Sequence, residues 1–328
     1  MKSSLFLALP ALTNAASYCW KTLAPLPQAR QEHATAAIGP DVYAVSGLFA
    51  NNITDSVAVY HTTTNTWSSA PPLPEAMHHA NVATVAGKLY VLGGISHSTG
   101  WTSTGKSYRF DPATQKWEAL ADMPDARGAG VVGVIDNVVY IAGGLSTKNP
   151  VDPKMHSGRE MQPMVKLTAY HTDTNTWTIY PDLDLPEGRD HAGGAIIDGV
   201  FYVVAGRRAS PDNNRNTVLA WDLKDRSAGW VERAAMPTTR GGVAGGVVGK
   251  KIYIFGGEGN AKVQTGVFPD VDVYDAPSNK WSSEAAMKSP RHGLGAAAVV
   301  GETLYLVGGG KTMGIADPVT TNESYGPC

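Results

Sequence analysis

The chain has 328 residues, a formal net charge of −2 and a pI of about 6.5, and 17% of its residues are charged. Nucleic-acid-binding proteins usually have an excess of basic residues, which this chain lacks. No apolar run is long enough to span a bilayer, so we expect neither nucleic-acid nor membrane partners. The length fits two average domains or one large repeat domain, and 36 glycines favour short strands and tight turns.

The first 16 residues have the composition of a secretory signal peptide. Lys2 precedes a short apolar run over residues 5–12, and small residues follow up to Ala16. Cleavage is expected before Ser17, which leaves residues 17–328 as one domain, outside the cell or in the secretory lumen. The alternative is a buried N-terminal strand or helix. Sequons at Asn52 and Asn322 are candidate glycosylation sites compatible with secretion.

One short apolar sequence motif that ends in two glycines recurs through the chain. Its clear copies lie at residues 89–94, 139–144, 252–257 and 304–309. Weaker copies lie at 42–47 and 201–206, where Ser46 and Ala205 replace the first glycine. An internal period of this length is typical of a propeller or a solenoid.

A tryptophan series recurs out of phase with the glycine strands. Its members are Trp20, Trp67, Trp117, Trp177, Trp230 and Trp281. Most of them follow an aromatic residue and a polar turn, as in the nearly identical phrases at 60–67 and 170–177. Aromatic residue, turn and tryptophan predict a β-hairpin.

A third marker precedes each glycine strand and opens a strand of small residues. The residues at this position are Arg30, Met77, Arg127, Arg189, Arg240 and His292. Each repeat therefore has four predicted strands, and four-stranded sheets repeated radially make a β-propeller.

These three markers together resemble the kelch repeat, and the resemblance covers all six copies. Met77 and His292 depart from the usual arginine, although Arg291 directly precedes His292. The sequence predicts an all-β fold, a six-bladed kelch-type propeller. The order of the tryptophans and the glycine strands also predicts how the ring closes. Trp20 precedes the first glycine strand, and the last repeat lacks a tryptophan. The N-terminal strand is therefore expected to complete the last blade.

This closure places Cys19 opposite Cys328. In a secreted protein we expect the two cysteines to form a disulfide that locks the ring. The alternative is a pair of free thiols.

Candidate functional residues fall on the face where the loops after the glycine strands meet the starts of the small-residue strands. We assign Arg127, His191 and Arg240 as catalytic, because imidazole and guanidinium groups can hold a carbonyl, an enolate or a carboxylate. The alternative for the repeat arginines is structural bonding to backbone carbonyls of a neighbouring blade. The long stretch from Gly144 to Tyr170 is expected to contribute. The substrate-binding candidates are Arg30, His33, His78, His97, Trp101, Arg159, Arg189, Arg207, Glu258 and His292.

Neither a metal nor another cofactor is expected. His78 and His79 with His191 or His292 are the candidate metal ligands. However, His78 and His79 are adjacent on a predicted strand and would point to opposite faces, so both cannot bind one ion. The fold also resembles that of galactose oxidase, whose copper centre needs a thioether-linked cysteine and tyrosine. Both cysteines here are assigned to ring closure, which argues against a copper-radical oxidase. Nucleotide-binding and serine-nucleophile motifs are missing in suitable context.

Three functions remain open at this point. The first is a secreted, cofactor-independent, probably monomeric enzyme that binds a small organic substrate at the channel mouth. Small secreted fungal kelch proteins, which this chain resembles, include natural-product cyclases of the hetero-Diels–Alderase type, so the resemblance implies an isomerase, lyase or cyclase. The second is a carbohydrate-binding or sugar-converting propeller of the mutarotase or lyase type. The third is a protein-binding kelch module.

Overall fold

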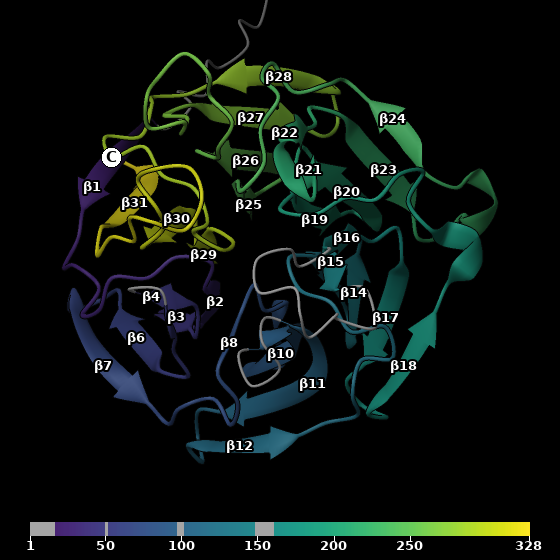
Figure 1. The fold of residues 1–328 in the computed structure, drawn as a ribbon, viewed down its shortest axis with the longest axis horizontal. Coiled ribbons are helices and arrows are strands. Elements are labelled where there is room, and N and C mark those ends of the chain that lie inside the picture. Colours follow the sequence, from purple (N-terminus) through teal and green to yellow (C-terminus); the bar gives the residue numbers. More distant parts are fainter. Residues whose placement is uncertain (1–16, 50–51, 97–101, 148–160) are drawn as a thin grey trace, which may run out of the picture.

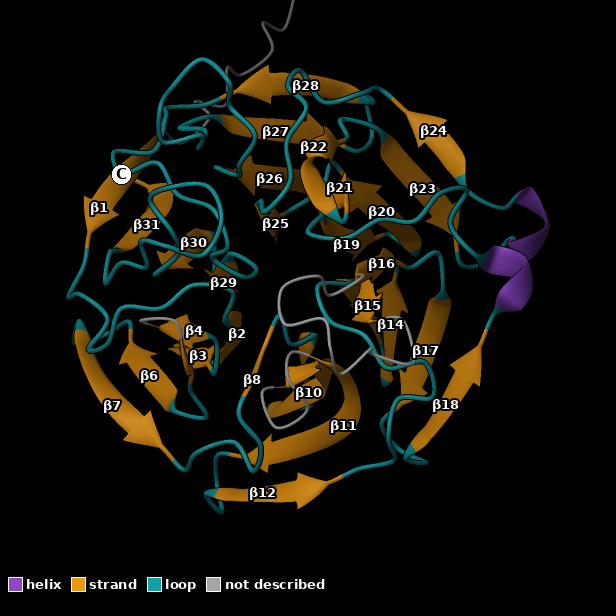
Figure 2. Ribbon diagram, in the orientation of Figure 1, coloured by secondary structure: helices purple, strands orange, loops and turns teal. Residues whose placement is uncertain are grey.

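The computed structural model describes residues 17–49, 52–96, 102–147 and 161–328. The described residues form six antiparallel sheets of four or five strands, arranged as blades around a central axis (Figure 1). Almost everything is strand or loop, and two three-residue 3-10 helices, η1 (Pro181–Leu183) and η2 (Arg226–Ala228), lie at the outer rim (Figure 2). No helix of the described ranges has the length and apolar character needed to cross a membrane.

Blades 1 to 3 follow one another along the chain, each from its inner to its outer strand. Their strands are β2 (Ala34–Ile38), β3 (Asp41–Val45), β6 (Val57–His61) and β7 (Thr66–Ala70) in blade 1; β9 (Val82–Val85), β10 (Lys88–Ser96), β11 (Thr102–Asp111) and β12 (Lys116–Ala119), with β8 (Met77–His78), in blade 2; and β13 (Val131–Ile135), β14 (Val138–Ala142), β17 (Leu167–His171) and β18 (Thr176–Ile179) in blade 3.

Blades 4 to 6 repeat the arrangement. Their strands are β19 (Gly193–Ile197), β20 (Val200–Val204), β23 (Val218–Asp222) and β24 (Val231–Arg233); β25 (Ala244–Val248), β26 (Lys251–Phe255), β27 (Val271–Asp275) and β28 (Lys280–Ser283); and β29 (Ala298–Val300), β30 (Thr303–Val307), β31 (Asn322–Pro327) and β1 (Tyr18–Thr22). Short two-stranded sheets follow the second strand of three blades: β4 (Leu48–Phe49) with β5 (Asn52–Ile53), β15 (Leu145–Thr147) with β16 (Met161–Pro163), and β21 (Arg207–Arg208) with β22 (Ser210–Asn214).

The ring closes as the sequence predicts. Strand β1 pairs antiparallel with β31, and Trp20 stands opposite Tyr325 in the register. The first described strand is therefore the outermost strand of the last blade, and the predicted fold is confirmed.

The core lies between neighbouring blades. Each of the six clusters of buried apolar residues draws its members from two adjacent blades. The tryptophan series adds a polar link at each of these interfaces, because every indole N–H donates to a backbone carbonyl of the preceding blade at 2.8–2.9 Å. Trp177, for example, donates to the carbonyl of Ala121. The recurring tryptophans thus join the blades as well as filling space.

The glycine pairs mark a sharp turn that needs glycine at one of its two positions. Gly47 and Gly257 have φ of +108° and +107°, and a Cβ on either would lie within 3 Å of a backbone carbonyl oxygen. Ser46 and Ala205, at the preceding position, have φ of +55° and +58°, which a side chain can adopt at a modest cost. This difference explains why the weaker copies lose only the first glycine.

Two expectations about the termini need correction. Cys19 and Cys328 are free thiols in the structure, and no disulfide joins them. They are neighbours, as ring closure requires, but the residue paired with Cys19 is Gly326, so Cys328 lies beyond the register of the two strands. Asn322 is buried in β31 and donates to the carbonyl of Ala24, so the folded protein cannot carry a glycan there. Asn52 is exposed, and its glycosylation stays a prediction.

Candidate functional site

A closed ring of backbone hydrogen bonds surrounds the axis where the inner strands begin. Each blade contributes one residue, two positions beyond the repeat arginine in most copies. The N–H of each ring residue donates to the carbonyl of the equivalent residue in the preceding blade at 2.7–3.2 Å. The ring residues are Glu32, His79, Ala129, His191, Gly242 and Gly293.

All six ring residues have φ between +52° and +62°, the left-handed region that side-chain-bearing residues seldom adopt. Three of them nevertheless carry large functional side chains, namely Glu32, His79 and His191. Non-glycine residues held in such a conformation cluster at functional sites. The shared geometry therefore singles out these three as candidates for function.

The three functional side chains of the ring converge over the axis. His79 Nε2 lies 2.8 Å from His191 Nε2 and 3.1 Å from Glu32 Oε2, and His191 Nε2 lies 3.8 Å from the same carboxylate oxygen. Ala129, Gly242 and Gly293 fill the other ring positions with little or no side chain. The convergence places three polar atoms from three blades within one small volume.

A second layer of side chains orients the two imidazoles. Asp190 Oδ1 accepts from His191 Nδ1 at 2.6 Å, which leaves His191 Nε2 as an acceptor toward the axis. Arg207 donates to that nitrogen from Nη2 at 3.0 Å and to Asp190 from Nε at 3.3 Å. His78 Nδ1 contacts His79 Nδ1, so the adjacent histidine is a partner of His79 and lies beside it.

Two further predicted residues, Glu258 and His292, border this cluster. The Glu258 carboxylate pairs with Arg207 and accepts from the backbone N–H of Gly314 at 3.0 Å. His292 Nδ1 lies 3.7 Å from Glu258 Oε2 and 3.8 Å from Glu32 Oε1, while His292 Nε2 donates to a backbone carbonyl. Both are almost fully buried, so the cluster is a closely packed network of charge.

The charge states of Glu32 and His79 are set by their surroundings. Burial alone would raise the pKa of Glu32, but His191, His292 and Arg207 outweigh it and the pKa is lowered. Burial, with His191 and Arg207, lowers the pKa of His79 well below its ordinary value. At neutral pH a charged carboxylate and a neutral imidazole therefore face each other.

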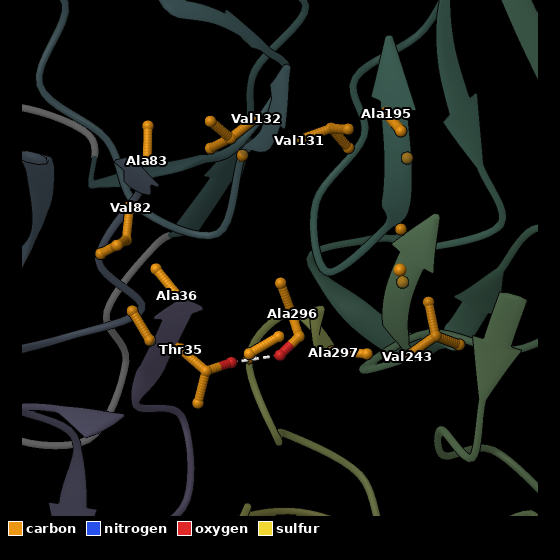
Figure 3. Close-up of a pocket in the computed structure, with 18 of the residues that line it drawn as sticks. Thr35, Ala36, Val82, Ala83, Val131, Val132, Ala195, Val243, Ala296 and Ala297 are labelled. Atoms are coloured by element: carbon orange, nitrogen blue, oxygen red, sulfur yellow. Dashed lines mark hydrogen bonds between the residues drawn. The ribbon is translucent and has the colours of Figure 1, made fainter. Parts of the chain in front are cut away.

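An apolar cavity of about 530 Å³ continues from the ring along the axis. It is lined by the small-residue inner strands, and Figure 3 shows Val82, Val131 and Ala195 around its wall, with Thr35 donating to the Ala296 carbonyl. His33 also lines it, and burial followed by Arg30 lowers the pKa of this histidine to about 3, so it stays neutral. Among the described lining residues none is Phe, Tyr or Trp. The polar cluster thus caps an apolar channel.

The structure corrects the assignment of the repeat arginines. Arg127 and Arg240 do not face the channel: both guanidinium groups are fully buried inside their own blades. Arg127 donates to the carbonyls of Gly143 and Ile141, and Arg240 pairs with Asp272 at 2.8 Å. Burial lowers the pKa of Arg127 and of Arg240 from the ordinary value.

Arg30 and Arg189 are buried in the same way. They donate to the carbonyls of Ser46 and Ala205, each within its own blade. The structural alternative for the repeat arginines therefore holds, but their partners lie in the same blade and not in a neighbouring one. Neither residue faces the channel mouth.

Of the other predicted residues, His191, Arg207, Glu258 and His292 come together at the ring. The predicted residues His97, Trp101 and Arg159, the long stretch at 148–160 and the signal segment 1–16 lie outside the described residues.

Three residues of the cluster lie on the face predicted from the sequence but have no catalytic or substrate-binding assignment there: Glu32, His79 and Asp190. The sequence feature that could identify Glu32 and His79 is the repeat position two residues beyond the repeat arginine. The other copies have Ala or Gly at this position, whereas three copies have Glu32, His79 and His191. The sequence alone does not indicate that this position forms the backbone ring around the axis.

Glu32, His79 and His191 are also a set that can hold a metal ion. Their ligand atoms all lie within 4.8 Å of one another. Two imidazole nitrogens and one carboxylate oxygen suit Zn²⁺ or Fe²⁺. The sequence argues only that His78 and His79 cannot both bind one ion. A site that uses His79 with His191 and Glu32 is not subject to that argument.

The cluster combines a carboxylate, two imidazoles and a guanidinium at one end of an apolar cavity. It can polarise a carbonyl oxygen or move a proton at one fixed point. The apolar wall below would hold the remainder of a small organic molecule.

Known proteins with similar sequences are kelch proteins. The "KLHDC2/KLHL20/DRC7 Kelch-repeats domain" matches residues 156–322, and the "Kelch motif" matches residues 29–74 and 76–124. "Kelch-like protein terF" of Aspergillus terreus is 36% identical over 87% of this chain, which spans 62% of that protein. "Beta-scruin" of Limulus polyphemus is 26% identical over 44% of this chain and 15% of its own length.

The solved "Structure of YjhT" superposes with a TM-score of 0.74 over 92% of this chain and 95% of that one. Its sequence identity is 18%, so this likeness concerns the fold alone. With the repeat markers, the closed ring of six blades and the matched repeats, the chain belongs to the kelch-repeat family.

Proposed function

We propose that this protein is a secreted enzyme of natural-product biosynthesis that binds a small organic substrate at the mouth of the propeller channel. One observation carries the proposal: Glu32, His79 and His191 converge from three blades over the end of an apolar cavity. A structural role alone does not require side chains of this kind in left-handed conformations on the axis.

The chemistry of the site favours a non-redox reaction of a carbonyl compound. Arg207 and the imidazoles would face the polar end of the substrate and stabilise negative charge that develops on its oxygen. The apolar channel would hold the hydrocarbon part and exclude water. These features suit an isomerase, lyase or cyclase, including a cyclisation in which an enone or quinone methide adds to an alkene. Such a step needs no organic cofactor, because fixed geometry and polarisation lower the barrier.

Secretion is supported by the pattern of residues 1–16, as the sequence predicts. A sugar-converting function has less support, since stacking platforms for sugar rings are not found among the described residues of the cavity wall. The relative terF bears a name that states only "Kelch-like".

Thermal-shift screening tests this function. Purified protein is incubated with apolar enones and quinone-methide precursors, and in parallel with mono- and oligosaccharides. We expect stabilisation by members of the first set, loss of that stabilisation in His191→Ala, and retention in His171→Ala. His171 is the matched control because it lies at the far end of β17 and bonds Thr178. Stabilisation by sugars alone would contradict the proposal.

Stabilising compounds are then assayed for turnover. We expect conversion to exceed the uncatalysed rate and to yield one stereoisomer. His191→Ala should return both rate and stereochemistry to those of the uncatalysed reaction. Equal turnover by wild type and this variant would show that the site of reaction lies elsewhere.

A further inference from the structure

We propose that Glu32, His79 and His191 bind one divalent transition-metal ion on the propeller axis, with an open coordination position toward the apolar channel. The ion's role as the electrophile for the substrate carbonyl rests on the function proposed above. The binding site itself rests only on the geometry of the ring and its neighbours.

The spacing of the ligand atoms fits a small ion. The three separations among His79 Nε2, His191 Nε2 and Glu32 Oε2 are 2.8, 3.1 and 3.8 Å. Ligands about 2.0–2.1 Å from a tetrahedral Zn²⁺ lie roughly 3.3 Å apart, so adjustments of about half an ångström suffice. Three protein ligands with one open position is the arrangement of catalytic zinc sites.

The second layer already holds the imidazoles in the form that binds metal. Asp190 accepts the Nδ1 proton of His191 at 2.6 Å, which leaves Nε2 bare toward the axis. His78 Nδ1 can accept the Nδ1 proton of His79 in the same way. A carboxylate or another acceptor behind each ligating histidine is the usual outer shell of a metal site.

The charges of the buried side chains around the ring also favour a bound cation. Glu32, Asp190 and Glu258 are at most 8% exposed, and Arg207 is the guanidinium that contacts Asp190 and Glu258. Three carboxylates against one guanidinium leave a surplus of acidic groups at the ring. Buried charge is stable only when it is compensated, and one dication cancels this surplus.

Arg207 is the residue that an incoming ion would displace. Its Nη2 atom lies 3.0 Å from His191 Nε2, so it occupies one approach to the ligand set. With an ion bound, this contact gives way while Arg207 keeps its pairing with Asp190 and Glu258. The guanidinium therefore opposes binding by charge repulsion, and its removal should tighten binding.

The ring leaves room for a substrate beside the ion. Its other three members are Ala129, Gly242 and Gly293, whose side chains reach no further than a methyl group. These three members therefore place no large side chain of their own beside the open coordination position. A carbonyl oxygen from the channel could reach it directly.

Metal titration of tag-free, full-length protein stripped with a chelator tests the inference. We expect calorimetry to show one Zn²⁺ per chain, and Co²⁺ to give the intense visible absorption of a tetrahedral site. Glu32→Gln, His79→Ala and His191→Ala should each weaken Zn²⁺ binding at least tenfold and abolish the Co²⁺ bands. His171→Ala, at the other end of its blade, should bind like wild type. Arg207→Gln should bind at least tenfold more tightly.

Circular dichroism and thermal melts of every variant verify the fold, and Arg207→Gln guards against loss of binding through misfolding because it predicts a gain. The inference is overturned if folded wild type binds no ion, or if the three ligand variants bind as tightly as His171→Ala. These titrations contain no organic ligand, so their failure is separate from that of the proposed function. Tight binding at the triad with no small-molecule stabilisation would support the metal site and refute the function.

Discussion

His79 Nε2 lies 2.8 Å from His191 Nε2, although the two residues are 112 positions apart and belong to blades 2 and 4. Among the described strands, none is shared by these two blades. The contact exists because both residues occupy the same position in the backbone ring and point toward its axis. A symmetric ring thus brings together side chains that the repeat pattern spaces far apart in sequence.

Two glycines of the ring provide a matched test of this arrangement. A Cβ at Gly293 would lie 2.7 Å from Glu32 Oε1, whereas a Cβ at Gly242 would have its nearest contact at 3.3 Å, with His292 Nδ1. Their φ values are +59° and +62°, so an alanine at either position has a similar backbone cost of about 1–2 kcal/mol. Gly293→Ala should displace the Glu32 carboxylate and weaken Zn²⁺ binding about tenfold, a free-energy difference of about 1.4 kcal/mol.

Calorimetric titration of both variants gives the comparison. Gly242→Ala is expected to keep near wild-type affinity and to show a similar loss of thermal stability. Equal affinities for the two variants would argue that the Glu32 carboxylate takes no part in binding.

Arg127 is expected to serve stability and not binding. Its guanidinium is fully buried, lies 2.8 Å from Asp125 and donates to Thr168. Arg127→Met leaves these partners unpaired, and we expect a loss of about 3–5 kcal/mol in the free energy of unfolding. Urea denaturation measures it, with Arg208→Met as the control because Arg208 is 48% exposed and should change stability by less than about 0.5 kcal/mol.

At a temperature where Arg127→Met is still folded, its affinity for Zn²⁺ and for small molecules should equal that of the wild type. A selective loss of either affinity in the folded variant would restore the catalytic assignment made from the sequence.

The fold could be predicted from the sequence because its markers are local and repeated. The glycine turns, the tryptophan hairpins and the small-residue strands each follow from residue types at fixed spacing. Ring closure followed from the position of Trp20 before the first glycine strand. The neighbouring positions of Cys19 and Cys328 followed from that closure. The covalent state of these two cysteines did not follow, because strand register sets proximity and not bonding.

The site was only partly predictable. Its face and several of its members, including His191 and Arg207, were identified from the sequence. The repeat arginines were mistaken for site residues, since nothing in the sequence distinguishes an arginine that points into its own blade from one that points to the axis. Strand alternation predicts that His78 and His79 cannot both bind one ion, but strand β8 ends at His78 and does not include His79. Its φ of +55° places it in a turn of the backbone ring, where that rule does not hold.

Three buried tyrosines predict sensitivity to alkaline pH. Burial raises the pKa of each to about 12, and each hydroxyl donates to the turn asparagine of its hairpin; the pairs are Tyr60 with Asn65, Tyr170 with Asn175, and Tyr274 with Asn279. The unfolded chain loses these protons near pH 10, before the folded protein does. The stability that they contribute is therefore fully present below pH 10 and is lost as the pH rises from 10 to 12.

Urea unfolding between pH 8 and pH 12 measures this loss. Tyr170→Phe should be about 1 kcal/mol less stable at pH 8, because the bond to Asn175 is gone, and should lose less stability than wild type between pH 10 and 12. Parallel curves for the two proteins over that range would show that Tyr170 does not contribute.

Trp177 tests the polar links between blades. Its indole N–H donates to the carbonyl of Ala121 in the preceding blade at 2.9 Å. Trp177→Phe keeps an aromatic ring against Tyr170 but removes the donor, so we expect a loss of about 1–2 kcal/mol in the free energy of unfolding. Urea denaturation at pH 7 provides the value. A stability equal to that of the wild type would mean that this bond contributes nothing.

The most direct measurement is anomalous X-ray diffraction at the zinc absorption edge from crystals of the full-length protein grown with one equivalent of Zn²⁺. The account predicts one anomalous peak on the propeller axis, about 2.0–2.2 Å from His79 Nε2, His191 Nε2 and a Glu32 carboxylate oxygen. Zinc bound only elsewhere, or an axis without an anomalous peak and with Arg207 still against His191, would contradict it.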